Sequence, residues 1–421
     1  MEQSDPALAA FDRLRVREVR GEYNHTASAC LAQFQSTAAS LGPDEKIKLE
    51  VIYLRKSNME LLKAVLADPQ ANKICSLFWW YKGKEDVSTV LPLLINSCRE
   101  LASLEVYFEH HSTFDFASSV LEHPNNKIKV LVIPKYAEGD IPRFFAALGQ
   151  SQVSVLTLSL CPKSVQGLHE YLAKDLLVRL EVGMDYKQVP QEVMMSLSKC
   201  TRLAKLEMLR CEFSQPTAFT HLPKSIARLE LAYCTFVGDF DWSFLADSNV
   251  RELDFRGSGS GVDGNQLGGA LAVHLRAKGL NELRFISCDF VDETLAAIGL
   301  GVGRIKKLKT DVHLNDASIK LIVLVLQSPN SEMKELVLRY AASSIETHLV
   351  PALKHPNCNL VKLSFRAYEP EHEEAAEKME DMFHNRLALF ALLQGRQVRR
   401  LYCPLRRLPV EMFRLVGQVL L

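Results

Sequence analysis

The sequence lacks several features that would assign it to a well-defined class of protein. Basic and acidic residues number 50 each, so no overall charge attracts nucleic acid or an anionic membrane. The ten cysteines include no Cys-x-x-Cys pair and no dense spacing, which argues against a zinc module and a disulfide scaffold. Apolar runs such as residues 321–326 are too short to cross a bilayer, and no basic stretch followed by an apolar core opens the chain. These absences predict a cytoplasmic protein with reduced thiols and no metal or other cofactor.

No Gly/Ser-rich or Pro-rich linker divides the 421 residues. This length exceeds the size at which one compact core usually stops growing, so an elongated array of repeats explains both observations. A short apolar phrase recurs along the chain: an aliphatic residue, two others, a second apolar residue, one other and a third, as in Leu203-Ala-Lys-Leu206-Glu-Met208. The copies begin at Phe11, Leu49, Ile74, Leu101, Ile128, Val153, Leu177, Leu203, Ile226, Val250, Leu280, Ile305, Met333, Leu360 and Val398.

Each phrase has the alternation of a strand, and the wider apolar spacing that follows it is typical of a helix. Repeated strand–helix units with parallel strands stack through right-handed crossovers. We expect residues 1–48 to form a first repeat and cap, residues 49–368 the repeat array, and residues 369–421 a helical cap with the last repeat.

Details of the repeats resemble the leucine-rich repeat family, and in particular its ribonuclease-inhibitor-like type. Segments ending in Pro-Asn lead from a helix to the next strand at residues 121–125, 326–330 and 353–357. Cys211, Cys234 and Cys288 each stand five residues after the second Leu of their phrase, where the resemblance implies a side chain turned inward toward the loop backbone. The predicted fold is therefore α/β, a right-handed leucine-rich repeat solenoid (horseshoe) with a concave parallel sheet of about 15 strands and helices on the convex side.

A charged column is expected on the concave face, because the residue between the second and third apolar positions points away from the core. This column carries four consecutive acids and then two cations: Glu181, Glu207, Glu230, Asp254, Arg284 and Lys309. The neighbouring column supplies Arg179, Lys205 and Arg228. Two interpretations stay open: a ladder that neutralises itself, or adjacent stripes of opposite sign that orient a protein partner.

An aromatic cluster near the amino end is the preferred contact site. Its members are Tyr53, Phe78, Trp80, Tyr81, Tyr107 and Phe108. Large aromatic side chains dominate hot spots of protein interfaces, whereas a register slip of one residue would place the same side chains in the core. The sequence thus predicts a non-enzymatic module that is monomeric before it binds another protein on its concave face.

Two alternatives rest on other segments. Residues 408–421 resemble the opening helix of an F-box, which implies the substrate receptor of a ubiquitin ligase or a secreted bacterial effector that imitates one; a helix that seals the array is the simpler interpretation. The glycine-rich residues 257–269 suggest a nucleotide-handling enzyme, but they lack the Gly-Lys-Ser/Thr ending of a phosphate loop. A flexible insertion is favoured there.

Overall fold

The structure is a computed structural model. It describes residues 16–21, 27–42, 45–54, 56–81, 86–108, 112–133, 139–159, 167–215, 217–257, 261–339, 345–353, 355, 357–366, 373–374, 376–378, 380–381 and 383–384. The chain divides into two compact units, Met1–Ala227 (unit 1) and Arg228–Leu421 (unit 2), which are described separately below.

Unit 1 is a parallel sheet whose strands follow one another in sequence order, with helices between them. The strands are β1 (Val16–Gly21), β2 (Lys46–Leu54), β3 (Ile74–Tyr81), β4 (Ser103–Phe108), β5 (Val130–Ile133), β6 (Val155–Ser159), β7 (Arg179–Gln188) and β8 (Lys205–Phe213). The helices are α2 (Ala27–Ser40), α3 (Lys56–Ala67), η1 (Pro69–Lys73), η2 (Val87–Val90), α4 (Leu91–Ser97), α5 (Thr113–Leu121), α6 (Ile141–Gln150), α7 (Leu168–Leu172), α8 (Gln191–Leu197) and η4 (Ala218–His221).

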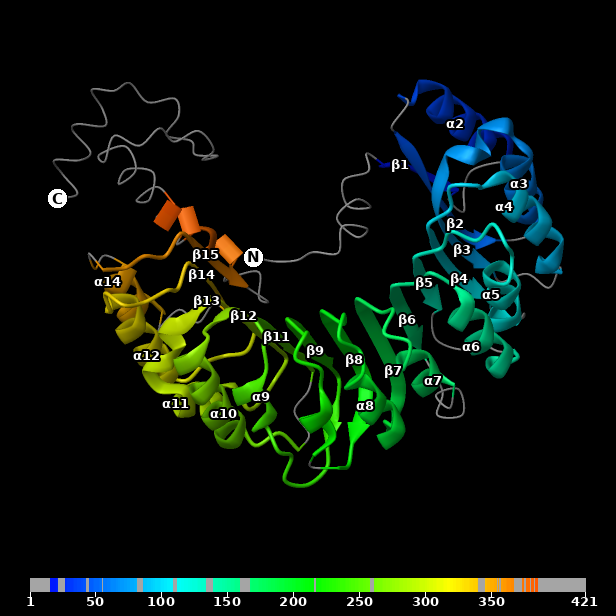
Figure 1. Ribbon diagram of the computed structural model, residues 1–421. Coiled ribbons are helices and arrows are strands. Elements are labelled where there is room, and N and C mark those ends of the chain that lie inside the picture. The colour runs from blue at the N-terminus through cyan, green and yellow to red at the C-terminus, as the bar shows by residue number, and fades with distance from the viewer. Residues whose placement is uncertain are drawn as a thin grey trace, which may run out of the picture. The chain divides into compact units, whose positions relative to one another are not determined.

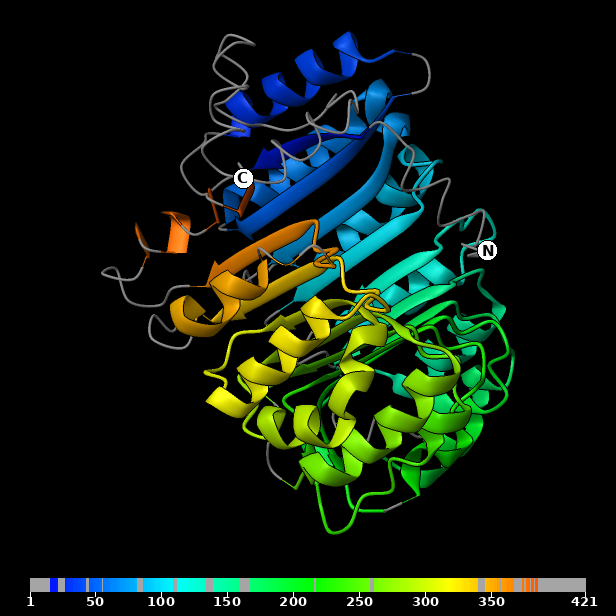
Figure 2. The same ribbon diagram turned by 90° about the vertical axis from the view of Figure 1, so that its left-hand side faces the viewer.

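Unit 2 repeats the same plan. Its strands are β9 (Arg228–Ala232), β11 (Glu252–Arg256), β12 (Leu280–Ile286), β13 (Ile305–Thr310), β14 (Glu335–Arg339) and β15 (Lys362–Arg366), with the short β10 (Thr235–Phe236) outside this order. Its helices are α9 (Phe244–Asp247), α10 (Gly264–Ala277), α11 (Val291–Ile298), η5 (Gly299–Arg304), α12 (Asp316–Gln327), η6 (Ile345–Leu349) and α14 (Val350–Leu353). The helices lie on the outer side of each sheet, and the yellow-green helices of unit 2 lie side by side (Figures 1 and 2).

The apolar phrase forms the core of both units. In unit 1 the second apolar residues pair in register from strand to strand, as Leu77 with Leu104 and Leu104 with Leu131. Leu253 and Leu283 do the same in unit 2, and all of these side chains are at most 1% exposed. Burying such a leucine contributes about 2 kcal/mol. The expected α/β leucine-rich repeat architecture is therefore confirmed within each unit.

One backbone conformation recurs at the same position of three repeats, within β8 and directly after β9 and β12. Arg210, Tyr233 and Ser287 have φ values of 51°, 55° and 52°, in the left-handed region. The cysteine that follows each of them is buried and its thiol contacts a backbone carbonyl, with Cys288 Sγ 3.3 Å from the Ile286 oxygen. The inward orientation implied by the family resemblance is thus confirmed; the ribonuclease-inhibitor-like subtype remains a prediction.

The Pro-Asn segments form one kind of turn. The side chain that precedes the proline accepts a hydrogen bond from the backbone N–H of the asparagine. The donor–acceptor distances are 3.3 Å for Asn125 to His123 Nδ1, 3.4 Å for Asn330 to Ser328 Oγ and 3.3 Å for Asn357 to His355 Nδ1. A helix end is thereby joined to the next strand by local side-chain capping.

The structure corrects the register that the sequence predicts for the second repeat. Leu77 is the second apolar residue of the phrase in β3, and Leu49 of β2 lies beside it. Glu50, and not Tyr53, therefore lies beside Phe78. Ile47, Leu49 and Val51 are buried because β2 alternates with a period of two through a long apolar run. Tyr53 lies on β2, but its side chain is outside the described part of the chain. The predicted strands at Phe11 and Val398, and residues 408–421, also fall outside the described residues.

Candidate protein-binding surface

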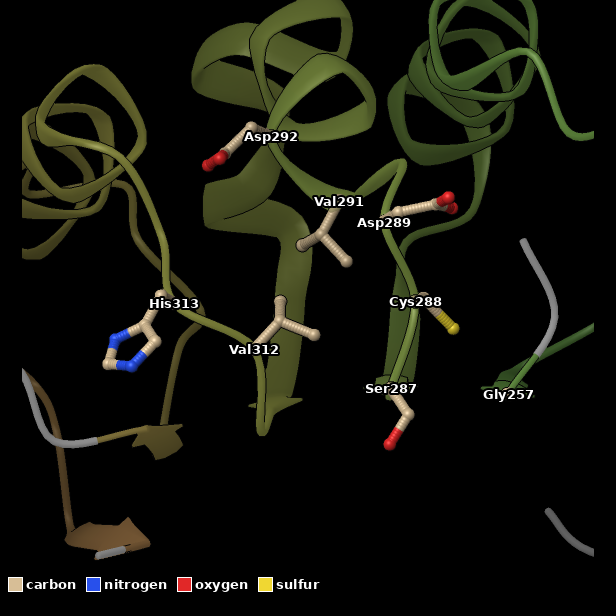
Figure 3. Close-up of a pocket in the computed structure, with 8 residues that line it drawn as sticks. All are labelled: Gly257, Ser287, Cys288, Asp289, Val291, Asp292, Val312 and His313. Carbon is tan, nitrogen blue, oxygen red and sulfur yellow. The ribbon is translucent and has the colours of Figure 1, made fainter. Parts of the chain in front are cut away.

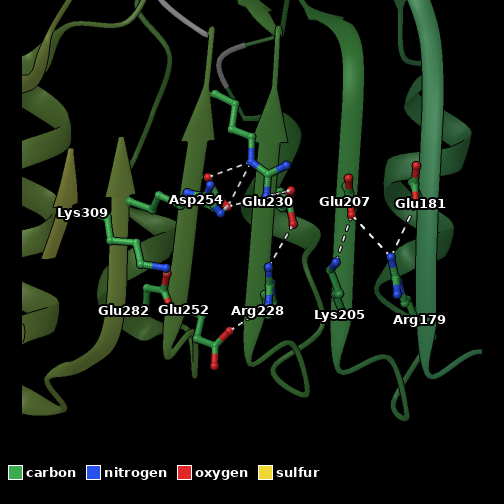
Figure 4. A network of polar contacts seen from close by, with 12 residues as sticks. Arg179, Glu181, Lys205, Glu207, Arg228, Glu230, Glu252, Asp254, Glu282 and Lys309 are labelled. Carbon is green, nitrogen blue, oxygen red and sulfur yellow. Dashed lines mark hydrogen bonds and ion pairs between the residues drawn. The ribbon is translucent and has the colours of Figure 1, made fainter. Parts of the chain in front are cut away.

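The inner face of unit 2, opposite its helices, carries ion pairs on neighbouring strands (Figure 4). In the strand register Asp254 lies between Glu230 and Arg284, and Arg284 lies beside Lys309 on the next strand, as the sequence predicts. Glu230 is only 1% exposed and accepts from Arg228 at 3.3 Å and from Arg256 at 2.5 Å. A buried carboxylate needs such partners, because an unpaired charge there would be strongly destabilising.

The other acids of this face are paired as well. Asp254 lies 2.8 Å from Arg256 and 3.5 Å from Arg284, while Glu282 lies 3.1 Å from Lys309. Burial raises the pKa of Asp254, and its hydrogen bond to Arg256 opposes that rise. Glu252 pairs with Arg228 at 3.2 Å, and Glu335 pairs with Lys307 and Lys362 at 3.1 Å each. The inner face of unit 2 therefore satisfies its own charges.

The two predicted acids of unit 1 are likewise neutralised. Glu181 and Glu207 stand opposite each other in the register of β7 and β8. Arg179 reaches both carboxylates, at 3.6 and 3.7 Å, and Lys205 lies 3.0 Å from Glu207 (Figure 4). Burial and then the neighbouring Glu207 raise the pKa of Glu181. These ion pairs favour the self-neutralised ladder over a free acidic stripe; that a partner contacts these charged residues stays a prediction.

The aromatic cluster divides between the core and the inner face. Tyr81 and Phe108 are 0% and 2% exposed, so their assignment to the outward surface was wrong. Strict alternation along β3 and β4 sends Trp79, Tyr81 and Phe108 inward and turns the residues between them outward. Phe78, Trp80 and Tyr107 are half-buried on the inner face and remain candidate contacts.

Four of these outward positions form a compact square on two adjacent strands. Phe78 pairs with Glu105, and Trp80 pairs with Tyr107. The Trp80 and Tyr107 rings meet edge to face, with centroids 5.1 Å apart. Paired residues on neighbouring strands are about 4.8 Å apart, and residues two apart on a strand about 6.6 Å. We call Phe78, Trp80, Glu105 and Tyr107 the aromatic–glutamate square.

Glu105 was missed as a site residue, although it stands in the predicted column. Among the described residues, its carboxylate has no hydrogen bond and no ion pair. Burial raises its pKa; Lys48 opposes this rise, and Glu50 and Glu181 add to it. The sequence held a signal for this difference: the neighbouring column offers Ser76, Ser103 and Val130 beside Glu105, where Glu207 and Glu230 have a Lys or Arg.

A hollow of about 520 Å³ lies over the loops that follow β11, β12 and β13. It is lined in part by Cys288, Asp292 and His313, whose side chains are drawn in Figure 3. Cys288 and His313 point away from each other, and Asp292 accepts the backbone N–H of Asn315 at 3.1 Å. The hollow therefore does not bring Cys288 and His313 together as the nucleophile and base of a catalytic site.

The glycine-rich segment serves packing in the part that the structure describes. Asp263 caps α10 and accepts the N–H groups of Asn265 and Gln266 at 2.8 and 3.1 Å, so a carboxylate already occupies this helix end. A Cβ on Gly268 would lie 2.6 Å from Ala297 Cβ, which shows how closely α10 approaches α11. Close helix packing, rather than a phosphate loop, accounts for these residues.

The described residues contain no group of three His, Cys, Asp or Glu side chains that could hold a metal ion. Nor does any helix among them have the length and apolar character needed to span a membrane.

Comparisons with known proteins find likeness at low sequence identity only. No family model matches the chain, and no curated protein matches its sequence. Solved structures with some likeness include an internalin from Listeria monocytogenes, with a TM-score of 0.43 and 11% identity over 80% of this chain and 94% of that one. The yeast Rad7–Elc1 complex gives a TM-score of 0.45 and 15% identity over 83% and 84%. A leucine-rich repeat protein of Leptospira interrogans gives 0.37 and 13% over 80% and 81%. The fold assignment rests instead on the strand register and the buried phrase residues within each unit.

Proposed function

We propose that the chain is a protein-binding module and that its primary contact surface is the aromatic–glutamate square of unit 1. The observation that carries this proposal is the placement of Phe78, Trp80 and Tyr107 together on the inner face, on strands held rigid by a buried core. Half-exposed Trp and Tyr side chains lose little conformational entropy on binding and bury a large area.

The contrast with the rest of the inner faces supports this location. Elsewhere the outward positions are occupied largely by ion-paired side chains, with nitrogen–oxygen distances of at most 3.7 Å within each pair. Exposed ion pairs contribute little binding energy, and a partner would have to desolvate them. The three aromatic rings of the square carry no charge to desolvate, so they are the better anchor.

The test compares partner capture by the full chain and by a Trp80→Ala, Tyr107→Ala double variant. Captured proteins are identified by mass spectrometry and their affinities are then measured with purified partner. We expect a loss of at least about 2 kcal/mol, roughly thirtyfold in affinity, because both rings belong to one hot spot.

A matched control is Tyr186→Ala, which removes an aromatic side chain that is 52% exposed on β7 of the same unit. This control should bind as the unmodified chain does. Equal capture by the double variant and the unmodified chain would remove the square as the anchor. The cytoplasmic location, the monomeric state before binding and the ubiquitin-ligase role of residues 408–421 stay predictions from the sequence.

A further inference from the structure

Glu105 differs from the other acids on the inner faces in one respect. Glu50, Glu181 and Glu207 in unit 1 have a Lys or Arg nitrogen within 2.5, 3.6 and 3.0 Å. Glu230 and Asp254 in unit 2 have two such partners each. Glu105 has none among the described residues, so unit 1 presents one carboxylate without a direct ion pair, on which Lys48 acts only from a longer distance.

The surroundings of Glu105 make this charge unusual. Phe78 lies beside it on β3, and Val132 lies on its other side on β5. Tyr107 follows it by two residues on the same face of β4 and meets Trp80 edge to face. Apolar neighbours exclude water and strengthen any interaction of the carboxylate with an incoming charge. Aromatic faces also attract cations within about 6 Å.

Both kinds of group favour the same ligand chemistry. A carboxylate pairs with an ammonium or guanidinium group, and Trp and Tyr rings bind the same groups through their faces. The backbone positions of the square lie about 4.8 by 6.6 Å apart and include one carboxylate, so one basic side chain is enough to balance its charge.

We infer that the aromatic–glutamate square binds a single Lys or Arg side chain from the protein partner, with Glu105 as the counter-ion and the Trp80–Tyr107 pair as the aromatic surface beside it. This inference rests on the proposed function and adds the chemistry of the partner residue. The incoming cation supplies to Glu105 what Arg179, Lys205 and Arg256 supply to the acids elsewhere on the inner faces.

The probe is a library of random dodecapeptides displayed on phage and selected on the full chain. Selected peptides are synthesised, and their affinities are measured by fluorescence anisotropy against the unmodified chain and the variants Glu105→Gln, Glu207→Gln and Trp80→Ala. Glu207→Gln is the matched control, because it changes an acid of the same column that already has Lys205 and Arg179. Circular dichroism verifies that each variant is folded.

We expect the selected peptides to share one Lys or Arg. Their affinity should fall about tenfold or more on Glu105→Gln and on Trp80→Ala, and less than about twofold on Glu207→Gln. Replacing the shared basic residue by norleucine should weaken binding to the unmodified chain and leave binding to Glu105→Gln nearly unchanged, since the two changes remove one interaction.

The opposite outcomes separate the two proposals. Peptides that depend on Trp80 but lack a basic residue, or bind Glu105→Gln equally well, would overturn the inference and leave the proposed function standing. A selection that yields no peptide, or none that depends on Trp80, counts against both.

Discussion

The inner faces of the two units are built on the same strand register and carry different surfaces. In unit 2 the acids Glu230, Asp254 and Glu282 are each held by at least one Lys or Arg. In unit 1 the strands β3 and β4 carry aromatic side chains and an acid, Glu105, that has no such partner among the described residues. One repeat plan thus supports two kinds of surface: one whose charges pair internally, and one that we propose as the contact surface for a partner.

The largest expected effect removes the central cation of the unit 2 network. Arg256→Ala should lower the free energy of unfolding by about 3 kcal/mol, because it deprives the buried Glu230 and Asp254 of a shared partner. The midpoint of urea unfolding, followed by circular dichroism, measures this loss.

The control for that variant is Arg143→Ala. Arg143 pairs with Glu122 at 2.6 Å, but both side chains are more than 40% exposed, so the unfolding midpoint should hardly change. Equal effects of the two substitutions would show that burial does not distinguish the unit 2 network from an exposed ion pair.

A second substitution gives unit 1 the character of unit 2. Val132 stands beside Glu105 in the register and is half-buried, so Val132→Lys places a cation next to this carboxylate. We expect the affinity for the basic peptides to fall about tenfold, equivalent to about 1.4 kcal/mol, because the internal cation replaces the partner's. Val132→Gln, which adds a polar group without charge, is the matched control. Unchanged binding to Val132→Lys would contradict the role of Glu105 as counter-ion.

The smallest expected effect concerns the stability of unit 1 as the pH changes. Burial raises the pKa of Glu105 above that of an ordinary glutamate, so the folded state favours the protonated carboxyl. Its contribution to stability is present below the ordinary pKa and is lost as the pH rises through the raised pKa. Lys48, Glu50 and Glu181 are the charged groups that act on it.

As the pH rises from about 4 to 7, the free energy of unfolding of Glu105→Gln should increase relative to that of the unmodified chain by a few tenths of a kcal/mol, because solvent screening keeps the effect small. Urea unfolding of both proteins at both pH values measures this difference. A Glu105→Gln variant that is less stable than the unmodified chain at neutral pH would reveal an internal partner for the carboxylate.

The repeat fold could be predicted from the sequence because each unit buries the same phrase. Leu206, Leu229 and Leu253 have identical roles, and a parallel sheet with one strand per repeat satisfies all of them. The prediction failed where the phrase was ambiguous. The apolar run of β2 fits the phrase in two registers, one through Leu49, Ile52 and Leu54 and one through Ile47, Leu49 and Val51. The burial of Ile47, Leu49 and Val51 selects the second register.

The candidate site was harder to predict. Adjacent aromatic residues on one strand cannot all face outward, so Tyr81 and Phe108 belong to the core while Trp80 and Tyr107 do not. Glu105 differs from the other acids because the neighbouring positions hold no Lys or Arg that pairs with it. This difference depends on contacts across strands, which the residues of one column alone do not reveal.

The Pro-Asn turns are local structures that allow the number of repeats to change. In each of them the hydrogen bond that closes the turn joins residues only two positions apart, as between His123 and Asn125. A whole repeat could therefore be deleted or duplicated between two such turns while each junction keeps its own closure. We expect the chain to tolerate additions in whole repeats, which would widen its inner surface by one strand spacing each, far better than additions of a few residues within a strand.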